Sequence, residues 1–175
     1  MNLYTLCYPK LTSEDRRFID EYRNEYDIPF RDVVAPHFTM VFGCAEVSES
    51  VYREHVHGVA QSQGVIRFTC RYAMPANDDS NNNYYVFLVP DEGYSELSKL
   101  HDQLYRGVLA PYLRLDIPYV PHIGIATIPD APQIKALCDG LNSSGVIVSG
   151  EIDTISVCSY DGSKITDLET FQCQT

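Results

Sequence analysis

The sequence predicts a layered fold of the α/β or α+β class. Segments of β-prone apolar residues alternate with segments whose apolar residues recur at helical spacing, and the chain closes on two β-prone segments joined by the turn dipeptide Asp161-Gly162. The 175 residues are 45% hydrophobic and 21% charged, which is typical of a globular chain that buries a core. We expect residues 1–175 to form one unit, either a single compact body or two small lobes that share a core.

The expected helices and strands follow from three patterns: the alternation of polar and apolar residues, the helical spacing of apolar residues, and the positions of turn residues. Thr12 or Ser13 caps the first helix and Ser48 the second, while the 75–83 stretch is too rich in Asn and Asp to pack. The near-continuous apolar run 84–89 predicts a central strand. The predicted strands are 3–8, 37–42, 65–72, 84–89, 122–128, 146–159 and 165–173, and the predicted helices are 13–26, 49–63, 94–109 and 131–141.

The charge of the chain excludes some classes of partner. Thirteen basic residues stand against 24 acidic ones, a net charge of −11, whereas proteins that bind long nucleic acids use clustered Lys and Arg. We therefore expect a small nucleotide or a short RNA end as ligand, and no long nucleic acid. No apolar run is long enough to span a bilayer, and the N-terminal segment lacks the apolar core of a signal peptide, so we expect no membrane association and a cytoplasmic location. The oligomeric state is left open.

The six cysteines are spread along the chain without a Cys-x-x-Cys pair, and no Cys/His cluster has the spacing of metal ligands. A cytoplasmic chain favours free thiols that pack as small apolar side chains. We expect no disulfide framework, no bound metal and no cofactor.

Two similar segments contain the candidate site. Val34-Ala-Pro-His37-Phe-Thr39-Met-Val and Tyr119-Val-Pro-His122-Ile-Gly124-Ile-Ala both place Pro-His before alternating apolar residues, about half the chain apart. Along a strand, residues i and i+2 share a face, so His37 lies beside Thr39 and His122 beside Gly124. A single histidine in an apolar strand is usually a packing residue. The second copy favours two imidazoles that face one cleft.

Two opposed histidines suit displacement at a phosphate. In-line attack places the entering and leaving oxygens on opposite sides of phosphorus, so one imidazole accepts a proton while the other donates one. Histidine does both near neutral pH. The Thr39 hydroxyl, together with backbone N–H groups, suits the non-bridging oxygens, although a threonine here is also an ordinary β-former. The Tyr119 ring either packs against the rest of the protein or stacks on the base of a nucleotide ligand.

The paired motifs resemble those of the 2H phosphoesterase superfamily, which includes bacterial 2′-5′ RNA ligase-like proteins and 2′,3′-cyclic phosphodiesterases. Its signature is two His-x-Thr/Ser-x motifs flanked by apolar residues, and the similarity extends over about 3–157. The resemblance implies an α+β, bilobal, duplicated fold with two antiparallel sheets flanking a central cleft and helices outside. It also implies that His122 activates water, that His37 protonates the leaving oxygen, and that Thr39 binds the phosphate. The chain departs from the signature at Gly124, where the pattern has Thr or Ser.

The sequence thus leads to one main hypothesis and two rivals. The main hypothesis is a metal-independent phosphodiesterase acting on a cyclic phosphate of a nucleotide or RNA end. In the first rival, the same cleft binds a phosphorylated ligand with little or no turnover, because Gly124 replaces the motif threonine. In the second, the fold serves protein interaction and the cleft is vestigial. Saturable ligand binding and turnover distinguish the three.

Overall fold

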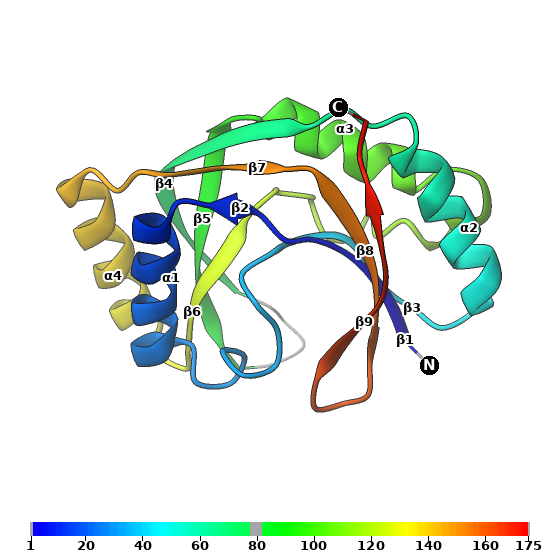
Figure 1. The fold of residues 1–175 in the computed structure, drawn as a ribbon. Coiled ribbons are helices and arrows are strands. Elements are labelled where there is room, and N and C mark those ends of the chain that lie inside the picture. Colours follow the sequence, from blue (N-terminus) through cyan, green and yellow to red (C-terminus); the bar gives the residue numbers. More distant parts are fainter. Residues whose placement is uncertain (1, 78–81, 175) are drawn as a thin grey trace.

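The computed structural model describes residues 2–77 and 82–174, which form two antiparallel sheets with helices on their outer faces. One sheet has the strand order β3-β1-β8-β9 and the other the order β2-β7-β4-β5-β6. Figure 1 shows the sheets curving toward each other, with α1 and α4 at one end of the molecule and α2 and α3 at the other. This is the predicted α+β fold with two sheets and outer helices.

The elements follow the expected order. The strands are β1 (Asn2–Cys7), β2 (Lys10–Leu11), β3 (Phe38–Cys44), β4 (Ile66–Asn77), β5 (Tyr84–Glu92), β6 (Ile123–Ile128), β7 (Val148–Ile152), β8 (Thr154–Tyr160) and β9 (Ile165–Gln172). The helices are α1 (Ser13–Tyr26), α2 (Glu49–Ala60), α3 (Tyr94–Leu104), the 3₁₀ helix η1 (Gly107–Tyr112) and α4 (Ala131–Ser144). As expected, Thr12 caps α1, and β5 lies inside its sheet between β4 and β6.

Three expectations were wrong, two because strand pairing overrides a local pattern and one because a glycine changes the backbone direction. The stretch predicted as one strand over 146–159 is two strands, since β7 pairs with β4 in one sheet and β8 with β1 in the other. Residues 75–77, expected to be unpaired, extend β4 because Pro75, Ala76 and Asn77 lie opposite 84–86 of β5. Residues 78–81 of that expected loop lie outside the described residues. The helix predicted to reach residue 109 ends at Leu104, and Gly107 at φ 53° starts the 3₁₀ turn.

The alternation along the two motif strands is as predicted. Phe38 and Met40 of β3, and Ile123 and Ile125 of β6, are buried in the core. His37 and His122 come immediately before their strands and, like Thr39 and Gly124, are half-buried. All six cysteines are buried free thiols. No helix among the described residues is long and apolar enough to cross a membrane.

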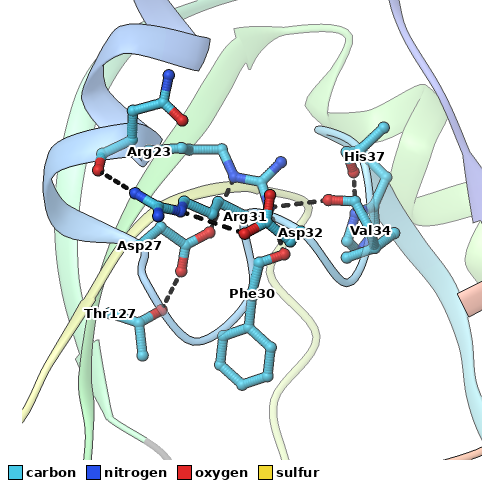
Figure 2. A network of polar contacts seen from close by, with 10 residues as sticks. Arg23, Asp27, Phe30, Arg31, Asp32, Val34, His37 and Thr127 are labelled. Carbon is cyan, nitrogen blue, oxygen red and sulfur yellow. Dashed lines mark hydrogen bonds and ion pairs between the residues drawn. The ribbon is translucent and has the colours of Figure 1, made fainter. Parts of the chain in front are cut away.

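A buried ion pair fixes the segment that leads to His37. Arg23 near the end of α1 donates from Nε to Asp27 Oδ2 at 2.8 Å, and its Nη2 donates to the carbonyl oxygens of Phe30 (3.0 Å) and Val34 (2.8 Å). Thr127 of β6 donates to the other Asp27 oxygen at 2.7 Å. Figure 2 shows this network, in which one guanidinium and one carboxylate connect α1, the 27–36 segment and β6. We call it the Arg23–Asp27–Thr127 network.

Removing one member of this network should lower the free energy of unfolding far more than removing one member of an exposed ion pair. Arg23→Met leaves Asp27 as a buried carboxylate without its cation, and should lower the free energy of unfolding by about 3–5 kcal/mol. Arg16→Met is the matched control on the same helix, because the Arg16–Asp20 pair is exposed, and should cost about 0.5 kcal/mol or less. Urea denaturation measures both variants. Equal losses would mean that the network does not stabilise the fold.

Candidate active site

Each motif histidine is held by the backbone carbonyl two residues before it. His37 Nδ1 lies 2.8 Å from the Ala35 oxygen, and His122 Nδ1 lies 2.6 Å from the Val120 oxygen. A carbonyl oxygen only accepts, so Nδ1 carries the hydrogen in both rings. Each neutral imidazole therefore has its lone pair on Nε2, and Nε2 is the atom available for proton transfer.

The two histidines lie within electrostatic range of each other. Burial is the main reason that the pKa of His122 is lowered to about 4. The hydrogen bond to Val120 partly offsets this effect, and the neighbouring His37 lowers the pKa further. The pKa of His37 is also lowered to about 4, again mainly by burial, and the Arg23 guanidinium adds to the effect. Both imidazoles are thus neutral at pH 7 in the free protein, and each disfavours a proton on the other.

Tyr119 connects the two motifs directly. Its hydroxyl donates to the backbone oxygen of Thr39 at 3.1 Å, and its ring stacks on the buried His101 with centroids 3.7 Å apart. The residue predicted to stack or pack beside the second motif therefore packs here on α3, and its hydroxyl contacts the backbone of the first motif. The Thr39 hydroxyl itself makes no hydrogen bond within the described part of the chain. It is half-buried, and so remains available to a ligand.

The space beside His122 is open at Gly124. A methyl group placed at its Cβ position would meet no heavy atom within 4 Å, so packing does not require a glycine here. Gly124 lies opposite Phe87 of β5, and the Phe87 ring stacks on His122 with centroids 3.6 Å apart. One face of the His122 imidazole is therefore covered, while the neighbouring strand position lacks any side chain.

Three residues of this region were not identified from the sequence. Phe87 lies in a run that reads as an ordinary buried strand, and Arg23 is a charged residue on the buried face of α1, four positions after Ile19. Tyr8 approaches the His37 ring edge-on at 6.4 Å, and its hydroxyl donates to Asp167 of β9 at 2.8 Å. Phe87 and Tyr8 are brought to the motifs by elements distant in sequence, whereas the spacing of Arg23 from Ile19 is the local signal that could have placed it on the buried face of its helix. Among the described residues, no group of three His, Cys, Asp or Glu side chains is arranged to hold a metal.

Several solved structures share this fold over nearly the whole chain. A protein titled simply a phosphoesterase is 17% identical, with a TM-score of 0.62 over 99% of both chains. The TT0787 protein of Thermus thermophilus is 20% identical, with a TM-score of 0.63 over 98% of this chain and 97% of its own. LigT of E. coli, solved with 3′-AMP, is 19% identical, with a TM-score of 0.59 over 99% of this chain and 98% of its own. These similarities establish the 2H phosphoesterase fold.

The sequence also matches the 2′-5′ RNA ligase superfamily over residues 11–164, a range that includes both Pro-His motifs. The chain belongs to this superfamily. No curated protein matches it in sequence.

The lowered histidine pKa values predict how stability depends on pH. Both histidines titrate near pH 4 when folded and near pH 6.5 when unfolded, so between these values the unfolded chain binds more protons. Their contribution to stability is complete above about pH 6.5 and is lost as the pH falls toward 4. His37→Gln/His122→Gln should flatten this part of the curve, measured by urea denaturation from pH 4 to 7.5. His57→Gln, at a position stacked on Phe171, is the control. An unchanged slope in the double variant would contradict the assignment.

Proposed function

We propose that this protein hydrolyses a 2′,3′-cyclic phosphate of a nucleotide or short RNA end, with His122 as general base and His37 as general acid. The observation that carries the proposal is the matched pair of half-buried imidazoles, each with Nδ1 bound to a carbonyl and Nε2 left free. Superfamily membership supports phosphodiester chemistry in general, and the LigT structure with 3′-AMP supports a nucleotide monophosphate as product. Because the two motifs come from different sheets, residues 1–175 act as one unit in this proposal.

The reaction places one proton transfer on each side of phosphorus. Water attacks phosphorus as its proton passes to His122 Nε2, and the bond from phosphorus to one ribose oxygen breaks as His37 Nε2 protonates that oxygen. His37 must therefore enter the step as the cation. The negative cyclic phosphate supplies the charge that favours this form, opposing the effect of burial on the pKa of His37. The Thr39 hydroxyl donates to a non-bridging oxygen.

Turnover should need each motif histidine and should not need an added metal. His37→Ala and His122→Ala should each lower kcat by about 10²–10⁴, because each removes one proton transfer. Activity on 2′,3′-cyclic AMP should persist in EDTA. His57→Ala, at an exposed position outside the motifs where the ring stacks on Phe171, should retain wild-type turnover. Full activity in either motif variant, or activity that needs added metal, would refute the mechanism.

The pH dependence of kcat/KM should be bell-shaped with an acidic optimum. The reactive free enzyme carries one proton on the histidine pair, and since the pKa of each histidine lies near 4, this form declines as the pH rises above about 5. Steady-state rates from pH 4 to 8, over a range in which circular dichroism shows folded protein, test this. A plateau that extends through pH 8 would mean that His37 is not the proton donor.

The open position at Gly124 favours one alternative, a protein that binds a phosphorylated ligand with little turnover. Gly124 offers no hydroxyl where the superfamily pattern has one, and losing one such contact typically lowers the rate by about 10²–10³. The surrounding space admits a larger residue. Turnover of a cyclic phosphate by the wild-type protein distinguishes slow catalysis from binding alone.

Gly124→Thr should increase the rate on 2′,3′-cyclic AMP, by up to about 100-fold, because it adds a donor to the phosphate oxygens. Gly124→Val is the matched control, with the same shape and no hydroxyl, and should give no increase. Thr39→Val should remove most of the remaining activity. If Gly124→Thr and Gly124→Val are both slower than wild type, the glycine accommodates a bulkier substrate and its missing hydroxyl is not a defect.

A further inference from the structure

The two motif histidines differ in the aromatic ring that lies beside each of them. The Phe87 ring lies face to face with the His122 imidazole, with centroids 3.6 Å apart and ring planes 14° from parallel. The ring beside His37, that of Tyr8, lies 6.4 Å away and is inclined at 67°. Within residues 2–77 and 82–174, no ring stacks on the face of His37. The aromatic surroundings thus distinguish two imidazoles whose hydrogen bonds are alike.

The Phe87–His122 contact has a geometry that two neutral rings do not prefer. Carbon atoms in contact lie about 3.5–4.0 Å apart, so centroids at 3.6 Å place one ring almost directly over the other. Neutral aromatic rings have negative faces, and they favour offset or edge-to-face pairs over this arrangement. A cation over the face of an aromatic ring is attracted to it instead. The contact therefore becomes more favourable when His122 is protonated.

His122 has no carboxylate of the kind that stabilises the imidazolium of many general bases. Its Nδ1 is bonded to the neutral Val120 carbonyl, and no carboxylate contacts the ring within the part of the chain that the structure describes. His101 offers a comparison, because it stacks on Tyr119 at 3.7 Å and also has a carboxylate oxygen of Asp102 3.0 Å from its Nδ1. At His122, an aromatic face stands where a general base often has an anion.

The sheet holds Phe87 in a fixed place. Phe87 lies on β5, between β4 and β6, opposite Met74 on one side and Gly124 on the other. The Tyr85 ring, two residues earlier on the same face of the strand, stacks against it with centroids 5.7 Å apart. The stack covers a face of the His122 imidazole, whereas Nε2 lies in the ring plane at its edge. Phe87 can thus act on His122 without obstructing its proton transfer.

We propose that Phe87 is a positioning residue for His122, and that its ring face stabilises the imidazolium that forms when His122 accepts a proton from the attacking water. This inference rests on the proposed cyclic phosphodiesterase function. In that reaction an O–H bond of water breaks, its proton bonds to His122 Nε2, and His122 passes from neutral to cationic. The stack is stronger in the charged state, so it stabilises the transition state more than the bound substrate. His37 passes from cationic to neutral in the same step, and a stacked ring there would oppose the reaction.

The test weakens the negative face of the ring while nearly keeping its shape. Replacing Phe87 by 4-fluorophenylalanine and then by pentafluorophenylalanine makes the face progressively less negative, but continues to exclude water from His122. On 2′,3′-cyclic AMP at pH 7, kcat should fall along this series, by about tenfold for the pentafluoro ring. Pentafluorophenylalanine in place of Phe171, whose ring stacks on His57 outside the motifs, is the matched control and should leave kcat unchanged.

Phe87→Leu distinguishes the charge of the ring face from its shape. This variant removes the aromatic face, and should lower kcat at least as much as the pentafluoro ring does. If Phe87→Leu is slow while the fluorinated proteins keep the wild-type kcat, the ring acts by its shape alone and the inference is wrong. Wild-type kcat in all three altered proteins would overturn it as well.

A titration separates failure of this inference from failure of the proposed reaction. In His37→Gln, NMR follows the protonation of His122 without its coupled partner, from pH 4 to 7 and without substrate. With pentafluorophenylalanine in place of Phe87, the titration curve of His122 should move to lower pH by about 0.5–1, because the charged ring loses its attractive partner. The His57 signals in the same spectra should titrate unchanged. A shifted curve without turnover of any cyclic phosphate would contradict the proposed reaction alone, and an unshifted curve would overturn the role of Phe87.

Discussion

The Arg23 guanidinium and the Asp27 carboxylate, both buried, determine where the first motif lies. Arg23 lies near the end of a helix packed on the five-stranded sheet, whereas His37 immediately precedes a strand of the four-stranded sheet, and the 27–36 segment must cross between them. A crossing segment leaves backbone carbonyls without partners, and Arg23 donates to two of them. Asp27 neutralises Arg23 and accepts from Thr127 of β6. A single polar cluster thus aligns the His37 segment with the strand that follows His122.

The same compact packing sets the chemistry of the histidines. Burial lowers the pKa of both rings, and the Ala35 and Val120 carbonyls select one tautomer for each. Both rings are neutral at pH 7 in the free protein, and each has its lone pair on Nε2. In the proposed function a bound anion favours protonation of His37, which links proton uptake to ligand binding and favours a phosphate over a neutral ligand even in an acidic protein. The overall charge of −11 therefore argues against long polyanions without excluding a small one.

Tyr119 and Gly124 show how the second motif differs from the first. Tyr119 is fixed between His101 and the Thr39 backbone, so it contributes to the spacing of the two motifs. Gly124 leaves open space at the position where β3 presents Thr39. The site is therefore asymmetric: one side has the Thr39 hydroxyl, and the other has an imidazole stacked on Phe87 and open space at Gly124.

Local sequence determined the pattern of elements, the buried faces of the motif strands and the pairing of two Pro-His motifs. It did so because alternation, capping residues and a repeat are properties of neighbouring residues. Only the tertiary structure decided that residues 146–159 divide between two sheets, that Phe87 covers His122, and that Arg23 is buried beside the His37 segment. These outcomes depend on partners far along the chain or in another sheet, and a β-prone run or a helical arginine looks the same with or without them. The sequence therefore identified the superfamily and the fold class, and the packing of two sheets decided the surroundings of the two motifs.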